Sequence, residues 1–252
     1  HGSEGRRRIS LADKLPFLLA AAAVVMVTMF SQAQSAGGGR RGYPGGSPLA
    51  ALFTMLPVLG SYLGDCLWPA NLLPYYMVKI RTELDWAVLA GGGLALVLAW
   101  LGVVFWRRNR RCFFYYALFF LGLLPVSQVV PIITLKQDRY LYFPLLGLAG
   151  LAAEGACLVV DRFPRCRHLV TCALTLLVLA LPILTLEQLR HWQDDLSLWS
   201  YTVKRDPDNT LGWLLLSKVQ TRLGDGGQAR AAWLKYNYLK ENHGPLRGYE
   251  DQ

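Results

Sequence analysis

Long apolar runs are the feature that most limits how this chain can fold. Hydrophobic residues make up 53% of the 252 residues. They gather in runs close to the roughly 20 residues that an α-helix needs to cross a bilayer. The five clearest runs cover residues 15–31, 86–106, 112–128, 141–160 and 169–186. Such runs exclude an ordinary soluble domain, so the sequence predicts an all-α, polytopic transmembrane protein with a membrane domain over residues 15–187.

A further apolar stretch, residues 48–77, has a less regular pattern. It contains the helix-breaking residues Pro57, Gly60, Gly64, Pro69 and Pro74. Proline removes a backbone donor and bends or ends a helix, and irregular backbone inside a membrane needs protein or water around it. The pattern therefore predicts a re-entrant or interfacial element here rather than another regular span.

Basic residues indicate the orientation of the spans. They gather at 6–8 before the first run, at 107–111 between the second and third, and at 162–168 between the fourth and fifth. If five spans alternate, these segments lie on one side, which the positive-inside rule makes cytoplasmic. Residues 1–14 then form a cytoplasmic basic flank, and residues 188–252 lie on the lumenal or periplasmic side. The net charge of +9 is explained by this topology, and no nucleic-acid partner is predicted.

The cysteines and histidines show no metal-ligand or disulfide pattern. None of the five cysteines lies in a CxxC pair, and the four histidines are scattered, so neither a zinc site nor a disulfide framework is predicted. No glycine-rich phosphate loop or metalloprotease motif occurs, and the glycines 91–93 inside an apolar run indicate a helix-packing surface. The chain begins at His1, which indicates a processed, tagged or partial chain.

Residues 188–252 change character and show a helix–turn–helix pattern. One helix is predicted to stop at Asp206-Pro207, and the next to end at the glycine turn 224–226. The apolar residues at helical spacing are Trp213, Leu216, Val219 and Leu223, then Ala229, Trp233 and Tyr236. The pattern resembles a tetratricopeptide repeat, whose unit is about 34 residues. Since one repeat cannot bury its own faces, these helices are expected to dock on the membrane domain or on further repeats, and to bind a protein acceptor or partner.

Three strings then occur in a particular order. They are L-W-P-A-N-L-L-P-Y-Y at 67–76, L-G-L-L-P at 121–125 leading to Q-D-R-Y-L-Y-F-P at 137–144, and H-W-Q-D-D-L-S-L-W at 191–199. Over about residues 14–240 this order resembles the C-terminal half of the transmembrane and tetratricopeptide repeat glycosyltransferases, the animal O-mannosyltransferases of that name and their bacterial relatives. The resemblance implies a partial GT-C membrane fold in the endoplasmic reticulum or a bacterial inner membrane. It also implies transfer of a sugar from a polyprenyl- or dolichyl-phosphate carrier to a protein acceptor on the outer side.

The same resemblance implies which parts are missing. In the family the catalytic acidic residue lies in the first outer loop, upstream of this sequence, so no catalytic residue is expected here and neither Asp65 nor Asp138 is nominated. No cofactor is implied beyond the lipid-phosphate-linked sugar as donor, and a role for a divalent metal is left open. The chain departs from the family at Lys136-Gln137, where a small residue often precedes Asp-Arg.

Charged residues directly before the 141–160 run form the strongest candidate site. Arg139 presents a planar fork that can hold phosphate oxygens and stays charged at working pH, and Lys136 adds a point charge three residues away. Asp138 is expected to orient Arg139 or to cap the following helix. The alternative is that Arg139 and Lys136 extend to lipid headgroups and that Asp138 pairs with one of them.

The remaining candidates each carry a structural alternative. Residues that would line a groove for the acceptor or isoprenoid, or else anchor a surface element, are Trp68, Asn71, Tyr75 and Tyr76. Tyr140 and Tyr142 would contact a lipid or sugar, or belong to an interfacial aromatic belt. Glu154 inside a run is interpreted as structural, in reach of Arg162 or water, and Asp65 as part of a solvated polar face.

Two other functions compete with sugar transfer. A non-catalytic membrane scaffold would use the tetratricopeptide-like helices to recruit a protein partner. A transporter is disfavoured, because few charges lie within the apolar runs and no paired broken helices are evident.

Overall fold

The computed structural model describes residues 42–243, apart from 70, 71 and 133, and near the N-terminus only residues 15, 16, 19, 23, 26 and 27. The chain divides into two compact units, residues 1–41 and the larger Gly42–Glu250. The described positions of the smaller unit are helical. The predicted flank 1–14 and most of the predicted 15–31 span lie outside the described residues.

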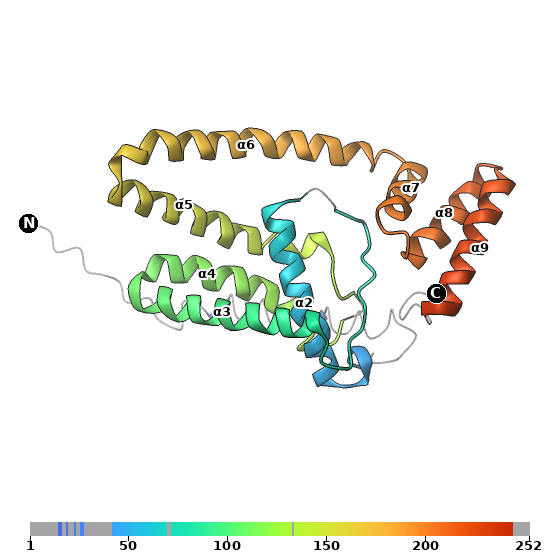
Figure 1. The fold of residues 1–252 in the computed structure, drawn as a ribbon, viewed down its shortest axis with the longest axis horizontal. Helices are drawn as coiled ribbons and strands as arrows, with labels where there is room; N and C mark the ends of the chain where they lie inside the picture. Colours follow the sequence, from blue (N-terminus) through green and yellow to red (C-terminus); the bar gives the residue numbers. More distant parts are fainter. Residues whose placement is uncertain are drawn as a thin grey trace, which may run out of the picture. The chain divides into compact units, whose positions relative to one another are not determined.

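Within its described part, the larger unit is built from helices and short 3-10 turns and has no strand (Figure 1). The α-helices are α2 (Pro48–Leu67), α3 (Trp86–Arg108), α4 (Arg110–Leu123), α5 (Pro144–Arg162), α6 (Arg167–Arg190), α7 (Asp195–Arg205), α8 (Thr210–Arg222) and α9 (Gly226–His243). The 3-10 turns are η1 (Pro44–Gly46), η2 (Leu124–Val126), η3 (Asp138–Leu141) and η4 (Pro164–Cys166). The all-α prediction is confirmed for this part of the chain.

Four helical segments of the described residues are long and apolar enough to cross a membrane. They are Pro48–Leu67, Trp86–Arg108, Pro144–Arg162 and Pro164–Arg190. The last three coincide with the predicted runs 86–106, 141–160 and 169–186. Their length and composition are consistent with a membrane protein.

The stretch predicted to be re-entrant begins as one continuous helix. Ser47 caps α2, since its Oγ accepts from the Ala50 N–H at 3.1 Å, and Pro48 occupies the first turn, where a missing N–H costs nothing. Pro57 lies inside the helix without ending it. The chain leaves helical geometry at Trp68, directly before Pro69. Irregular backbone is confined to the described residues that follow α2, 68, 69 and 72–85. The re-entrant or interfacial position of this stretch stays a prediction.

The predicted run 112–128 forms a shorter helix than its apolar length indicates. The helix α4 ends at Leu123, and the chain continues in the 3-10 turn Leu124–Val126. Pro125 lies inside this turn; a proline lacks the backbone N–H of an α-helical hydrogen bond and its ring crowds the preceding turn, which favours the end of α4 here. At ~1.5 Å per residue, α4 falls short of a full span.

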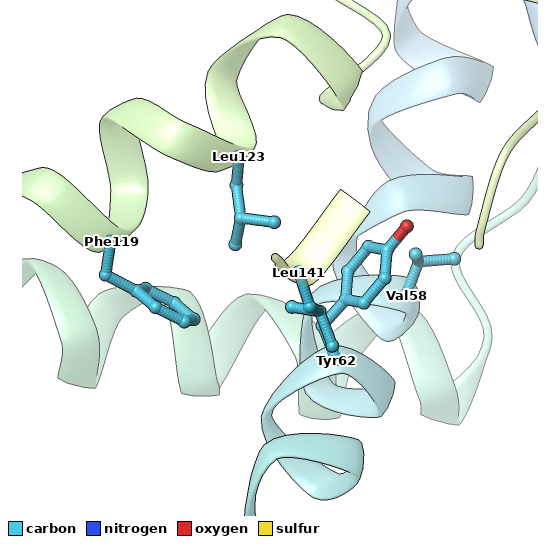
Figure 2. Close-up of a cluster of buried hydrophobic side chains, with 5 residues drawn as sticks. All are labelled: Val58, Tyr62, Phe119, Leu123 and Leu141. Carbon is cyan, nitrogen blue, oxygen red and sulfur yellow. The ribbon is translucent and has the colours of Figure 1, made fainter. Parts of the chain in front are cut away.

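Consecutive helices from α2 to α5 pack against one another, with a shared apolar core (Figure 2). The buried cluster is Val58, Tyr62, Phe119, Leu123 and Leu141, from α2, α4 and η3. Gly147 lets α5 approach α4 closely, because a Cβ there would lie 2.5 Å from the Phe119 nitrogen. The predicted packing role of the glycine run is confirmed at Gly91, where a Cβ would lie 2.6 Å from the Leu56 carbonyl carbon.

The helices α7, α8 and α9 pack in sequence around a smaller core of Val203, Leu216 and Ala232. The first turn of α8 is capped by Asn209, whose Oδ1 accepts from the Gly212 N–H at 2.9 Å. Gly224 follows α8 with a φ of +80°, the left-handed conformation that glycine adopts at helix ends. The predicted helix–turn–helix is present, while its identity as a tetratricopeptide repeat stays a prediction.

Candidate functional site

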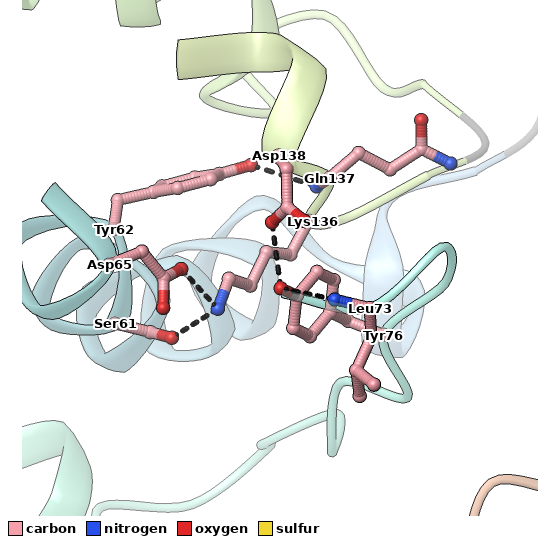
Figure 3. A network of polar contacts seen from close by, with 8 residues as sticks. All are labelled: Ser61, Tyr62, Asp65, Leu73, Tyr76, Lys136, Gln137 and Asp138. Atoms are coloured by element: carbon pink, nitrogen blue, oxygen red, sulfur yellow. Dashed lines mark hydrogen bonds and ion pairs between the residues drawn. The ribbon is translucent and has the colours of Figure 1, made fainter. Parts of the chain in front are cut away.

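Lys136 is the centre of a buried polar network between α2 and the segment before η3 (Figure 3). Its Nζ lies 2.7 Å from Oδ2 of Asp65 and donates to the Oγ of Ser61. Both carboxylate and hydroxyl come from the last turns of α2. A buried ammonium is costly unless it is paired and hydrogen-bonded, and this pairing fixes residue 136 on α2.

Two tyrosine rings complete the surroundings of the same ammonium. Its Nζ lies 4.0 Å from the ring centroid of Tyr76 and 5.8 Å from that of Tyr62. Aromatic faces attract a cation at such distances. Both predicted roles of Lys136, binding an external phosphate and extending to lipid headgroups, require a free ammonium. The structure instead pairs this ammonium inside the protein, so neither role is seen. Asp65 likewise belongs to this network and not to the solvated face expected from the sequence.

Asp138 faces Tyr76 rather than the arginine that follows it. The Tyr76 hydroxyl donates to Oδ1 of Asp138 at 2.7 Å and accepts from the Leu73 N–H at 3.0 Å. Burial raises the pKa of Asp138 to about 6; the charge of Asp65 adds to the rise, while the Tyr76 hydrogen bond and the Lys136 charge oppose it. No side-chain cap bond precedes η3. The predicted roles of Asp138, orienting Arg139 or capping the helix, are therefore not those seen.

Arg139 differs from its charged neighbours because its side chain is exposed. Within the described part of the chain this side chain makes no ion pair or hydrogen bond, and its guanidinium carbon lies 5.7 Å from the Tyr140 ring centroid. The two anchored residues before it, Lys136 and Asp138, hold the backbone in place. Of the predicted phosphate-binding residues, Arg139 alone keeps its charge available to a ligand.

The predicted aromatic candidates do not share one environment. Tyr140 packs against the apolar core of α2 and α4, whereas Tyr142 and Trp68 are 77% and 69% exposed. Tyr75 and Tyr76 are half-buried, and Asn71 lies outside the described residues. Exposure of Trp68 and Tyr142 fits an interfacial belt, and Tyr76 belongs to the polar network instead of a groove wall.

The segment after α2 also contacts α6 and the turn before α8. Gln188 of α6 donates through Nε2 to the Leu72 carbonyl at 2.7 Å. Asn209 donates through Nδ2 to the Tyr75 carbonyl at 3.0 Å. Through Tyr75 and Tyr76, this connecting segment thus contacts both Asp138 and the turn before α8.

Several members of these contacts were missed by the sequence analysis. Ser61 and Asp65 are four residues apart and therefore share a face of α2, which was the available signal for their common contact with Lys136. Gln188 carried no signal, because its partner is a loop carbonyl. Asn209 was detectable only as a helix cap.

Glu154 pairs across helices and not within its own helix end. Its Oε1 lies 4.0 Å from a guanidinium nitrogen of Arg111, at the start of α4. Glu154 contacts Arg111 and not the predicted partner Arg162, because α4 and α5 pack closely against each other. The structural interpretation of Glu154 fits this contact.

No group of three or more metal-ligating side chains occurs among the described residues. All five cysteines are free. The site therefore offers one exposed guanidinium, one carboxyl with a raised pKa and a buried ion pair.

Comparisons with known proteins give no match: none of the family models, the curated proteins or the solved structures is similar to this chain at a significant level. The functional argument rests on the residues and on the geometry around them.

Proposed function

We propose that this chain is the C-terminal part of a membrane glycosyltransferase. It transfers a sugar from a polyprenyl- or dolichyl-phosphate carrier to a protein acceptor on the lumenal or periplasmic side. The observation that supports this most is the exposed guanidinium of Arg139, unpaired among the described residues, beside a buried network in which Lys136 and Asp138 have partners.

The network gives Arg139 a fixed starting point for phosphate binding. Lys136 is tied to α2 and Asp138 to Tyr76, so the backbone before the arginine is held from two sides. A guanidinium on a fixed backbone loses less conformational entropy when it forms two parallel hydrogen bonds to phosphate. The same hydrogen bonds would stabilise the carrier phosphate as it leaves.

The helices after the apolar runs would bring the acceptor to this site. The turn before α8 is joined to residues 68–85 through the hydrogen bond from Asn209 to the Tyr75 carbonyl. Tyr76, the next residue, holds Asp138. An acceptor bound by α7–α9 would therefore be linked to the carrier segment through two successive residues, with the catalytic base supplied from elsewhere in the full enzyme.

Carrier binding by the purified chain tests the proposal. Binding of polyprenyl phosphate is measured in detergent with excess phosphatidylglycerol, which fills sites that accept any anionic lipid. Wild type is compared with Arg139→Ala and with Arg205→Ala, a change of another exposed arginine. We expect saturable binding in wild type and Arg205→Ala, weakened at least about tenfold in Arg139→Ala, since a charge-assisted hydrogen bond contributes ~1.5–3 kcal/mol. Equal binding by all three proteins would refute the role of Arg139.

A membrane scaffold is the second candidate, and an exposed face of α9 favours it. Trp233, Leu234 and Tyr238 are 46%, 60% and 59% exposed, and Leu234 and Tyr238 lie four residues apart on one face of the helix. On this hypothesis a Trp233→Ala/Leu234→Ala variant loses a protein partner that cross-links to the chain in membranes. Arg139→Ala would retain that partner and all wild-type behaviour.

A further inference from the structure

We propose that the arginine end of the helical bundle binds the headgroups of anionic phospholipids. This end is formed by the turn between α3 and α4 and the turn between α5 and α6, which lie at the same end of these helices (Figure 1). Its basic residues are Arg107, Arg108, Arg110 and Arg111 in the first turn and Arg162, Arg165, Arg167 and His168 in the second. All of these side chains are exposed.

The positive charge of the arginine end is almost unopposed within the part of the chain that the structure describes. Its one ion pair among the described residues joins Arg111 to Glu154, at 4.0 Å, the outer limit of such a contact. Arg111 itself remains 81% exposed. Asp161 is the other nearby carboxylate in the sequence, and it forms no ion pair in the described structure. A cluster of like charges with a single weak internal ion pair creates a strong positive field that attracts anions.

The first turn is held by a helix cap and a cation–π contact. Asn109 is the single residue between α3 and α4; its Oδ1 accepts from the N–H groups of Arg111 and Cys112 at 2.9 and 3.1 Å. The guanidinium of Arg110 lies 3.9 Å over the ring centroid of Trp106. Arginine beside an exposed tryptophan is typical of the headgroup layer, where the ring faces the acyl boundary and the cation faces phosphate.

The position of these cations on their helices also indicates an external anion. The helix α4 begins with Arg110 and Arg111, and α6 begins with Arg167 and His168; neither helix has an acidic residue in its first turn. A cation at a helix N-terminus is unfavourable, because the helix dipole is positive there. Phosphate groups would offset both the dipoles and the side-chain charges.

The apolar surfaces beside the arginine end identify the anion as a lipid. The segments Pro144–Arg162 and Pro164–Arg190, which flank the second turn, are apolar and largely exposed. Phe163 and Leu169, next to the arginines, are 58% and 71% exposed. Free phosphate would leave this apolar surface uncovered. A phospholipid places its charge on the arginines and its acyl chains on the helices, which satisfies both.

Lipid titration of the detergent-solubilised chain tests the proposal. Bound dioleoylphosphatidylglycerol and dioleoylphosphatidylcholine are counted by native mass spectrometry. The test variant removes four exposed charges at the arginine end: Arg108→Gln, Arg111→Gln, Arg165→Gln and Arg167→Gln. The control variant removes four exposed charges elsewhere: Lys79→Gln, Lys204→Gln, Arg205→Gln and Arg230→Gln. Circular dichroism checks that both variants retain the helix content of wild type.

We expect wild type and the control variant to bind phosphatidylglycerol more tightly than phosphatidylcholine. The test variant should lose this preference, by about fivefold for each arginine that contacts a headgroup, with unchanged binding of phosphatidylcholine. Undiminished phosphatidylglycerol binding by the test variant would overturn the proposal. Displacement of the lipid by an equal concentration of inorganic phosphate would also overturn it, in favour of a free-anion site. The expected result holds whether or not the chain handles a sugar carrier.

Discussion

Lys136 and Arg111 both face a carboxylate, yet they leave very different amounts of charge to the surroundings. The Lys136 ammonium lies 2.7 Å from Asp65, with the two side chains 6% and 18% exposed. The Arg111 guanidinium lies 4.0 Å from Glu154 and is 81% exposed. The Lys136 cation is paired inside the protein, whereas the Arg111 cation remains available to a ligand.

The difference follows from the solvent that each cation can reach. A charge buried away from water must be paired inside the protein, and losing its partner is strongly destabilising. An exposed charge is hydrated, so its internal pair contributes little. At Arg139 an exposed side chain follows two residues, Lys136 and Asp138, that are held by partners inside the protein. This is why the carrier proposal depends on Arg139 and not on Lys136.

The largest expected effect comes from removing one partner of the buried pair. Asp65→Asn leaves the Lys136 ammonium without a counter-charge, which should lower the free energy of unfolding by about 3–5 kcal/mol. The matched change at the pair whose cation is exposed, Glu154→Gln, leaves Arg111 in contact with water and should lower the free energy of unfolding by at most about 1 kcal/mol. Both are measured by equilibrium unfolding in detergent micelles, followed by tryptophan fluorescence.

A second substitution separates the ion pair from general damage to α2. Adding Lys136→Met to Asp65→Asn removes the orphaned cation and should restore part of the lost stability. If Asp65→Asn and Glu154→Gln destabilise the chain equally, the contrast between the two pairs is wrong.

The contrast also explains what the sequence could predict. Helix positions such as 86–106 and 169–186 follow from apolar length, and the close packing at Gly91 follows from glycine in such a run. The exposed arginines could be identified from the sequence, because a charged cluster beside an apolar run is a local pattern that does not depend on which helices pack together. The contact between Tyr76 and Asp138 joins residues 62 positions apart through irregular segments without periodicity, so local patterns could not predict it. The partner of Glu154 likewise depended on which helices pack together.

An intermediate effect is expected for the hydroxyl of Tyr76. Tyr76→Phe keeps the ring that faces the Lys136 ammonium at 4.0 Å, but removes the donor to Asp138 and the acceptor for the Leu73 N–H. A hydrogen bond to a charged group contributes ~1.5–3 kcal/mol, so the free energy of unfolding should fall by about that amount. A loss of stability as large as that of Asp65→Asn would contradict this ranking, because it would mean that the network depends on the Tyr76 hydroxyl as much as on the ion pair.

The smallest effect is a change in pH dependence at two carboxyl groups, one half-buried and one exposed. Burial raises the pKa of Asp138 to about 6 from its ordinary value of 3.8. The folded state therefore holds this proton more tightly than the unfolded state does. The stabilising contribution is fully present below about pH 3.8 and is lost as the pH rises through about 6.

Asp194 shows the opposite sign. Hydrogen bonds from the Ser197 N–H and hydroxyl lower the pKa of this exposed carboxyl, so its contribution is present above the ordinary pKa and is lost as the pH falls. Unfolding is measured between about pH 2.5 and pH 7.5 for wild type, Asp138→Asn and Asp194→Asn. Relative to Asp138→Asn, wild type should lose stability as the pH rises, with the loss spread between about pH 3.8 and pH 6. Relative to Asp194→Asn, wild type should lose stability as the pH falls below about 3.8. A wild-type curve parallel to that of Asp138→Asn would mean that this carboxyl is as well solvated as Asp194, and that the network around Lys136 is more open to water than its contacts indicate.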